Sequence, residues 1–458
     1  MSYREDEMRW KRIQDLLAAE AAGKELRAGV SQRTLFGIPS SVEQTIERIV
    51  AEDEEARRMK RERKARAGHV DHPLEPVFDE RSRVLVLGTM PSPKSREAGF
   101  YYGHPQNRFW RVLSALFDEP IATTNERRRD QLLCHHIALW DVLASCDIDG
   151  ASDASIVDAV PNDLSRILDA APVEAVFCTG AKAAELYARH CESATGMPCA
   201  KLPSTSPANA AVKFDELVEA YRAILPHLHE FEPCAFDVSD VVALEQEIAA
   251  AGTSLAELMD RAGTALAHRV HTTRPGARVT VLCGNGNNGG DGWVAARELV
   301  ALEHGVTLVT LRDADDLKAQ PARDTARAVK PVLDESPRAR VFVDPAEGDV
   351  ERVLANADVI IDALLGTGFA GQTVKAPFDQ WIRLSNEARR RGATVIAADT
   401  PSGLNAQTGI ASEPCIEADG TVTMIVSKTG LVRPEAARYC GEVRIAPLAY
   451  VEPLIMRA

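Results

Sequence analysis

Polar residues that could form a ligand site follow three apolar runs in the second half of the chain. The first stretch, GNGNNGGDG at 284–292, lies between the apolar VTVLC and the helix-like WVAARELVALEH; the others are DALLGTG at 362–368 and DTPSG at 399–403. Backbone N–H groups of a glycine-rich turn bind phosphate groups, and carboxylates can transfer protons. Because parallel strands end at one sheet edge, we expect the three stretches to meet there.

The glycines of the first stretch also have a simpler interpretation. Gly284, Gly286 and Gly289 match the GxGxxG pattern of dinucleotide-binding turns, which by itself favours a dehydrogenase. A tight turn does not need the additional amide and acid groups at 287–291. The alternatives that stay open are a plain turn here and, for the two later aspartates, caps of the next helix or turn.

A second group of residues in the middle of the chain could form a base-binding pocket. The stretch GTMPSPKSREAGFYYGHPQNRFW at 88–110 combines aromatic, basic and amide side chains, and LPSTSPANA at 202–210 is a rigid Pro/Ser loop. Aromatic rings stack on a flipped nucleobase, amides and hydroxyls read its edge, and a stiff loop can press into the minor groove. A structural turn with core aromatics is the alternative.

Strands that alternate with helices must position these residues. Between residues 72 and 228, RVLVLG and AVFCTG read as strands, and NRFWRVLSALF and AKAAELYARH read as helices. After residue 236, two helical patterns precede six apolar runs that alternate with helices, which predicts a mostly parallel sheet covered on both faces. We therefore predict the α/β class, with two three-layer α/β/α domains at 71–228 and 236–452.

Composition agrees with a multidomain globular protein. The 458 residues suggest two to three domains, and 45% hydrophobic and 26% charged residues are ordinary values. The start of the chain lacks the apolar core of a signal peptide, and no run of about 18 apolar residues follows. We expect a cytoplasmic location and no membrane association. Nine cysteines without a CxxC pair indicate reduced thiols.

The first 70 residues differ in composition from the rest. They are rich in Glu, Arg, Lys and Ala and end in an acidic block followed by a basic one, which predicts a charged helical extension or tether. The basic segment 57–66 could instead contact DNA phosphates. The net charge of −14 disfavours nonspecific adhesion to nucleic acid but permits a local basic groove.

The C-terminal motifs together resemble a known family. GNGNNGGDG, DALLGTGFAGQ, ADTPSGLNAQTG and EADGTVTMIVSKTGL are similar to the NAD(P)H-hydrate epimerases, also called the YjeF N-terminal domain, over residues 236–452. The resemblance implies an isomerase that interconverts the R and S forms of hydrated NADH and NADPH (NADHX and NADPHX). It also suggests a homodimer formed through this domain.

The resemblance assigns roles to individual residues. It implies that Asp399 is the acid/base group and also contacts the hydrated dinucleotide, and that Asn288, Asp362 and Ser402 hold a potassium ion. The other dinucleotide contacts that it implies are Asn287, Asn288, Gly289, Gly290, Asp291, Gly366, Thr367, Gly368, Phe369, Ala370, Gly371 and Gln372. Amide, carboxylate and hydroxyl oxygens are suitable ligands for such a hard cation.

One departure from the family pattern follows the sequence TVTM. Here the chain reads IVSKTGL, where the family often has Phe-Gly and Pro before the lysine. Lys428 is retained, so we question the local loop shape more than the activity. The chain ends near residue 458, which we expect to leave no room for the kinase-like dehydratase domain that is fused to many relatives.

The central motifs resemble a second family. HPLEPVFDERSRVLVLGTMPS, YYGHPQNRFW, IALWDVLASCDIDGASDASI and LPSTSPANA are similar to the deoxyinosine (hypoxanthine) DNA glycosylases of the uracil-DNA glycosylase superfamily, over residues 72–228. The resemblance implies hydrolysis of the N-glycosidic bond of a deaminated base, hypoxanthine and also uracil, in damaged DNA. No cofactor is implied, and no lysine suits lyase chemistry, so we expect a monofunctional glycosylase.

The chain departs from the pattern of this second family at one important position. Met90 stands where uracil-directed members carry Asp or Asn, and methionine cannot activate water, so Asn107 is our candidate to position the water. We interpret His104 as structural. The predicted DNA- and base-binding residues are Gly88, Met90, Pro91, Ser92, Tyr102, Ser204, Ser206 and Asn209, with Lys94, Arg96 and Arg108 as phosphate contacts.

The sequence thus predicts two fused enzymes that act on damaged nucleotides, without obligate communication between their sites. Two rival hypotheses stay open for the C-terminal domain. An NAD-binding oxidoreductase would bind intact NAD and transfer hydride. A noncatalytic nucleotide-binding or dimerisation module would have no activity, but Asp362, Asp399 and Ser402 argue against it.

Overall fold

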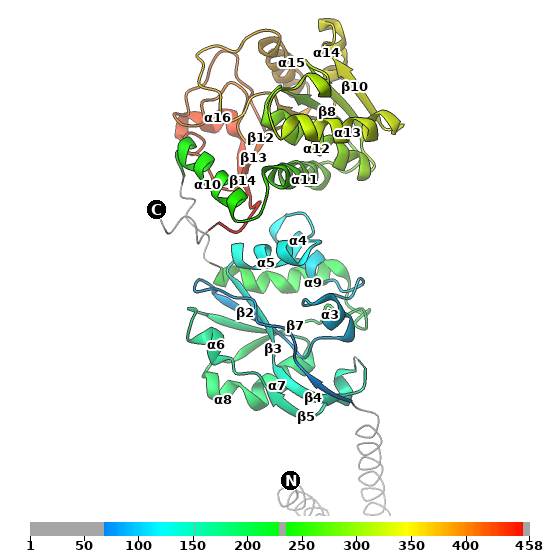
Figure 1. The fold of residues 1–458 in the computed structure, drawn as a ribbon, viewed down its shortest axis with the longest axis vertical. Coiled ribbons are helices and arrows are strands. Elements are labelled where there is room, and N and C mark those ends of the chain that lie inside the picture. The colour runs from blue at the N-terminus through cyan, green and yellow to red at the C-terminus, as the bar shows by residue number, and fades with distance from the viewer. Residues whose placement is uncertain (1–67, 151, 229–234, 452–458) are drawn as a thin grey trace, which may run out of the picture. The chain divides into compact units, whose positions relative to one another are not determined.

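The computed structural model describes residues 68–150, 152–228 and 235–451 (Figure 1). Residues 1–67 of the predicted charged extension therefore lie outside the described residues. Most of the segment at 229–236, which we expected to join the domains, lies outside them too. No helix in the described part of the chain is long and apolar enough to cross a membrane.

The C-terminal region contains a seven-stranded sheet in the order β10-β9-β8-β11-β12-β13-β14. All neighbouring strands are parallel, which confirms the predicted mostly parallel sheet. The strands are β8 (Arg278–Cys283), β9 (Gly305–Thr310), β10 (Ala339–Val343), β11 (Val359–Ala363), β12 (Thr394–Ala398), β13 (Gly420–Met424) and β14 (Glu442–Ala446). The chain runs outward from β8 to β10 and then returns to β11, so strand order reverses between β8 and β11.

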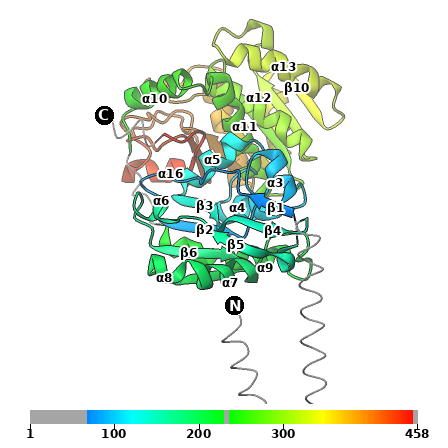
Figure 2. The ribbon, with the colours of Figure 1, turned by 60° about the horizontal axis from the view of Figure 1, so that its bottom comes forward.

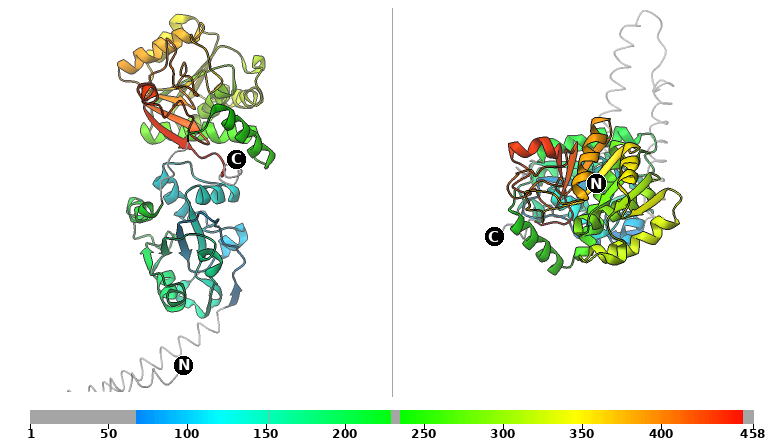
Figure 3. Two further views of the ribbon diagram at one scale, coloured as in Figure 1. Left: turned by 90° about the vertical axis from the view of Figure 1, so that its left-hand side faces the viewer. Right: turned by 90° about the horizontal axis from the view of Figure 1, so that it is seen from above.

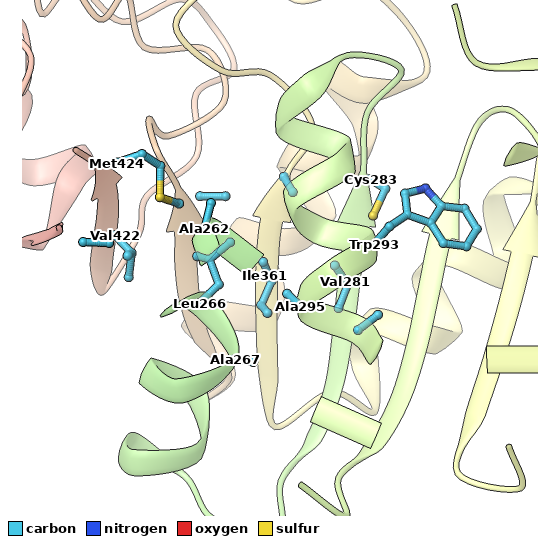
Figure 4. Packing of buried hydrophobic residues seen from close by; sticks show 14 of the residues in the cluster. Ala262, Leu266, Ala267, Val281, Cys283, Trp293, Ala295, Ile361, Val422 and Met424 are labelled. Atoms are coloured by element: carbon cyan, nitrogen blue, oxygen red, sulfur yellow. The ribbon is translucent and has the colours of Figure 1, made fainter. Parts of the chain in front are cut away.

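Both faces of this sheet are covered, as the near-continuous apolar strands predict. Successive residues point to opposite faces: in β11, Val359 and Ile361 join one buried cluster and Ile360 joins the other. Figure 4 shows the first cluster, in which Leu266 and Trp293 pack with Ile361 and Val281. Helices lie on both sides of the sheet (Figures 1 and 3). The three-layer prediction for this region is confirmed.

The helices of this region follow the predicted pattern. The two helical segments expected before the first strand are α10 and α11. The full set is α10 (Val238–Ala250), α11 (Leu255–Thr273), α12 (Asn287–Ala301), η3 (Ala314–Asp316), α13 (Ala322–Glu335), α14 (Glu347–Ala355), α15 (Phe378–Arg390), η4 (Pro434–Ala436) and α16 (Ala437–Cys440).

Two features of the region differ from expectation. We placed all of 284–292 in a loop, but α12 begins at Asn287, so the polar residues form its first helical turn. The last strand, β14, was not predicted. It lies at the sheet edge, and Ile445 is 40% exposed.

The central region contains a four-stranded parallel sheet in the order β3-β2-β6-β7. The strands are β2 (Val84–Gly88), β3 (Ile137–Asp141), β6 (Ala175–Thr179) and β7 (Cys199–Leu202). Helices α5 and α7 lie on opposite sides of it (Figure 2). The helices are α3 (Pro93–Ala98), α4 (Phe109–Phe117), α5 (Asn125–Cys134), α6 (Ser165–Leu168), α7 (Ala181–His190), α8 (Glu192–Thr195), α9 (Phe214–Tyr221) and η2 (Arg222–His227).

A small antiparallel unit was not expected from the sequence. Residues 68–72 and 143–160 form a separate compact unit with the strand order β1-β4-β5. Its elements are β1 (Gly68–Asp71), β4 (Leu143–Ile148), η1 (Asp153–Ser155) and β5 (Val157–Pro161). The first two strands pair antiparallel across 70 or more intervening residues, and no local pattern predicts such a distant partner.

Candidate functional site

The three polar stretches of the C-terminal region meet where strand order reverses. A cavity of about 700 Å³ lies there and is lined by residues that follow β8, β11 and β12. In a doubly wound sheet this reversal opens a crevice beyond the carboxyl ends of the strands, which is the usual ligand position. From the predicted site, the residues that line the cavity are Asn287, Asn288, Asp291, Gly366, Thr367, Gly368, Phe369 and Asp399.

Some predicted contacts lie elsewhere. Ala370, Gly371 and Gln372 are exposed and do not line the cavity, and Gly289 and Gly290 are buried beneath it. The glycine at 289 has a packing reason, because a Cβ there would lie 2.0 Å from the Gly284 carbonyl oxygen. The backbone thus approaches itself as closely as only glycine permits.

The first turn of α12 presents backbone donors to the cavity. Gly286 precedes the helix and provides no side-chain cap, so the first N–H groups remain available to a ligand. Asn287 is exposed at this helix start. A helix N-terminus attracts anions, and the arrangement fits a phosphate-bearing ligand.

The three residues predicted to hold potassium are linked by hydrogen bonds. The Ser402 hydroxyl and backbone N–H donate to the two carboxylate oxygens of Asp362 at 2.6 and 2.7 Å. The Leu365 N–H donates to the Ser402 hydroxyl at 2.9 Å, and the Asn288 amide nitrogen donates to the Leu365 carbonyl at 3.1 Å. One chain of contacts therefore connects β11, β12 and α12.

An unpaired oxygen makes this cluster suitable for a cation. The side-chain oxygen of Asn288 is buried and has no hydrogen-bond partner among the described residues. Burial raises the pKa of Asp362 to about 6, and the donated hydrogen bonds from Ser402 and Leu364 lower it by less. A buried carboxylate and an orphaned amide oxygen are groups that a bound cation would stabilise, so the residues fit the predicted potassium ion.

Asp399 is held by a buried lysine at the end of β12. The Lys428 ammonium, 1% exposed, donates to the Asp399 carboxylate at 2.5 Å and also contacts Thr423 and the Met424 carbonyl. The Thr423 hydroxyl and Met424 N–H donate to the same carboxylate oxygen. Asp399 has φ +63, a strained conformation for a non-glycine residue that is often associated with functional sites.

Sequence reasoning missed other residues of this cavity. Glu245, with Val242 and Gln246, forms a wall from α10. Burial raises the pKa of Glu245, and the charge of Asp399 adds to it. Spacing of three and four residues places these side chains on one helix face, but nothing in the sequence shows which face meets a ligand. Lys428 was noted as retained, yet its ion pair was not predicted.

In the central region, residues near the end of β2 surround an aromatic pair. The Tyr102 ring stacks on Phe109 with centroids 4.0 Å apart, and its hydroxyl is 2.9 Å from that of Thr179 at the end of β6. A Cβ on Gly88 would lie 2.1 Å from an Asp141 carboxylate oxygen. Asp141 is 5% exposed and was not among our candidates, although it ends an apolar strand as Asp362 and Asp399 do.

Most of the polar groups of the Pro/Ser loop bond within the central region. The Asn209 amide nitrogen donates to the Ser204 carbonyl, and the Ser204 and Ser206 hydroxyls accept from backbone N–H groups two residues later. Arg108 donates to the carbonyls of Val212 and Asn209 at 2.6 and 2.8 Å. These bonds use the two terminal nitrogens of the guanidinium, and a phosphate contact by Arg108 stays a prediction.

The remaining candidate residues of the central region differ in their exposure and in their hydrogen-bond partners. The Asn107 side-chain oxygen accepts from the Phe109 N–H and the Thr205 hydroxyl, both at 2.9 Å. Ser92 caps α3, and Pro91 is buried with its carbonyl bound to Arg96. Met90 is partly exposed and Lys94 is exposed in an ion pair with Glu97. His104 accepts from the Gln106 N–H, which agrees with a structural role.

Two family models match these two regions. Residues 255–430 match the model described as YjeF-related protein N-terminus, and residues 75–228 match the uracil DNA glycosylase superfamily. A solution NMR structure of a putative uracil DNA glycosylase from Methanosarcina acetivorans is 31% identical, covering 34% of this chain and 97% of that chain, with a TM-score of 0.31.

Curated relatives match the C-terminal region. The NAD(P)H-hydrate epimerase of Cenarchaeum symbiosum is 34% identical over 41% of this chain and 82% of the relative. The bifunctional NAD(P)H-hydrate repair enzyme of Coxiella burnetii is 39% identical over 46% of this chain, which spans only 40% of that relative's length. The chain therefore belongs to the NAD(P)H-hydrate epimerase family through its C-terminal region, and its central region matches the model of the uracil DNA glycosylase superfamily.

Proposed function

We propose that the C-terminal region interconverts the R and S epimers of hydrated NADH and NADPH. The observation that carries the proposal is the cavity at the strand-order reversal, where a helix N-terminus, Asp399 and the Asn288 cluster converge. The cavity would bind the substrate's pyrophosphate at the first turn of α12. Residues 287–291 and 366–372 would make further contacts with the substrate. The exposed segment 370–372 would have to close over the ligand to contribute.

Asp399 would transfer the proton at the epimerising carbon. The hydroxyl at C6 of the ring must leave and return on the other face, or the ring must open and close, and both routes need a proton donor and acceptor near that oxygen. Lys428, Thr423 and the Met424 N–H fix the Asp399 carboxylate in place. The ring nitrogen can supply electrons to the cationic carbon, so the reaction demands no redox cofactor.

A potassium ion would be held by Asn288, Asp362 and Ser402. Its charge would compensate the buried Asp362 carboxylate and fix the loops that follow β11 and β12, so its role would be structural and electrostatic. Ser402→Ala should weaken the potassium dependence of activity.

Equilibration of pure S-NADHX tests this function. The protein is incubated with S-NADHX in potassium or lithium buffer, and the R epimer is followed by chromatography. We expect acceleration over the spontaneous rate, and a larger one with potassium. An unchanged rate in both buffers would reject the epimerase proposal. Binding of intact NAD with hydride transfer would support the oxidoreductase alternative instead.

We propose that the central region hydrolyses the glycosidic bond of deaminated bases in DNA, hypoxanthine first and uracil second. The match to the glycosylase superfamily and the partly exposed Tyr102 ring, whose hydroxyl is hydrogen-bonded to Thr179 at the end of β6, favour this second function. The amide nitrogen of Asn107 would position water, since the side-chain oxygen is already bonded. Gly88, Met90, Pro91 and Ser92 would line the base pocket, with the Ser204–Asn209 loop against the DNA.

A duplex that contains one deoxyinosine tests the second function. After incubation and alkali treatment, cleavage at that position reports an abasic site. A strand that stays intact after prolonged incubation would reject the proposal, and cleavage without alkali would contradict a monofunctional glycosylase. A deoxyuridine duplex measures the base range. Homodimerisation and a cytoplasmic location stay predictions, and light scattering of the purified protein tests the first.

A further inference from the structure

Two carboxyl groups of the C-terminal cavity differ sharply in their surroundings. Asp399 accepts hydrogen bonds from Lys428, Thr423 and the Met424 backbone. Asp291, the fifth residue of α12, has no hydrogen bond or ion pair with any described residue, although both residues line the same cavity. The side chain of Asp291 is partly exposed, and that exposed part faces a ligand space.

The packing around Asp291 leaves it little freedom to leave the cavity. Its backbone carbonyl lies against α11, where a Cβ on Gly263 would approach it to 2.6 Å. The next residue, Gly292, lies against Cys283 and Ala363 at the ends of β8 and β11. The backbone is therefore fixed here, and a carboxyl group that lines the cavity without a protein partner must bind ligand, water or a proton.

The charges around Asp291 favour its neutral form. Burial raises the pKa of Asp291 well above its usual range, and the charges of Asp399 and Glu245 raise it further, while the Lys428 ammonium lowers it. The thiol of Cys283 nearby also has a raised pKa, because of burial, and stays neutral. The cavity therefore holds a carboxylate fixed by a cation and a second carboxyl that keeps its proton, a difference that is typical of acid and base pairs.

We propose that Asp291 is a second catalytic residue of the epimerisation, which donates a proton on one ring face while Asp399 accepts one on the other. This inference rests on the proposed epimerase function. In one direction, the Asp291 carboxyl gives its proton to the C6 hydroxyl. The C6–O bond breaks, its electron pair leaves with water, and the ring nitrogen pair forms the double bond to C6.

The return step completes the balance of atoms and electrons. Water adds to the opposite face of C6, the double-bond pair returns to nitrogen, and the water proton passes to Asp399. One turnover thus moves one proton from Asp291 to Asp399, and exchange with solvent restores both groups. The reverse direction uses the same groups in exchanged roles, and no oxidant or reductant is consumed.

Kinetics of Asp291→Asn in the full-length protein test the proposal. We expect kcat for S-to-R conversion to fall about 100-fold or more, the size of a lost general acid, with KM changed less than about threefold. The wild-type rate should fall as pH rises through the titration of Asp291, and the variant should lack this limb. Asp334→Asn, which changes an exposed aspartate of α13, is the matched control.

The other outcomes separate the two proposals. Wild-type protein that does not accelerate epimerisation rejects the proposed function itself. An active wild type with an unchanged kcat in Asp291→Asn, or with only KM raised, overturns the role of Asp291. If Asp291→Asn loses its folded circular dichroism spectrum, Asp291→Ala with added formate replaces it, and a rate that formate restores supports the role while no rescue opposes it.

Discussion

The two strand-end sites of this chain differ in which polar side chains they leave without a protein partner. In the central region, Arg108, Asn107 and Asn209 bond to groups of the protein itself. In the C-terminal region, Asp291 and the side-chain oxygen of Asn288 lack partners among the described residues. A site that encloses a small ligand can leave its polar groups for the ligand to satisfy. A loop that must press into a large duplex needs to be rigid beforehand, because ordering it upon binding would cost affinity.

The largest expected effect comes from Asp399→Asn. Loss of the acid/base group should lower kcat for epimerisation about 1,000-fold, within the range for general acid–base catalysis, and leave base excision unchanged. Parallel assays with S-NADHX and the deoxyinosine duplex measure both activities. Loss of excision in this variant would contradict the independence of the two sites.

Lys428→Met tests whether the buried ion pair also stabilises the fold. Removal of the ammonium leaves the Asp399 carboxylate buried without its cation, so we expect the free energy of unfolding to fall by about 3 kcal/mol. Urea unfolding measures it. The double variant with Asp399→Asn should recover part of the loss, since the unpaired charge is then absent. An unchanged urea midpoint for Lys428→Met would show that the carboxylate is solvated.

Arg108→Met tests the rigid loop of the central region. Loss of the bonds to Val212 and Asn209 should lower kcat/KM for excision about tenfold and the free energy of unfolding by about 1–2 kcal/mol, with epimerisation unchanged. Arg111→Met is the control, because this neighbouring arginine lies over the Phe214 ring. Equal excision by both variants would argue that loop rigidity is unimportant.

The smallest expected effect is at Asp358, which pairs with Arg278 at the amino ends of β8 and β11. The pair lowers the Asp358 pKa from 3.8 to about 2, so its contribution is present above pH 3.8 and disappears as pH falls toward 2. Solvent screens this pair, since the side chains are 65% and 37% exposed, and Asp358→Asn should cost at most about 1 kcal/mol. Urea midpoints of wild type and variant should converge near pH 2, and both activities should persist.

Much of the architecture was predictable because it depends on local patterns. Apolar runs alternating with helical segments indicated parallel sheets, and aspartates at strand ends indicated where side chains would meet. The antiparallel pairing of β1 with β4 was missed because it joins residues that are distant in the sequence. The start of α12 at Asn287 was missed because a glycine-rich stretch resembles a loop until packing supplies the helix with its neighbours.

The sequence by itself determined which chemical groups are present, the alternation of apolar strands with helices along the chain and the two families that its motifs resemble. Only the tertiary structure decided which of these groups already have a hydrogen-bond or ion-pair partner in the protein. Arg108 turns inward to loop carbonyls, Lys428 is buried against Asp399, and Asp291 keeps a carboxyl without a partner. The physical reason is that hydrogen bonds, burial and pKa values depend on neighbours brought together by folding, and residue type and spacing do not specify those neighbours.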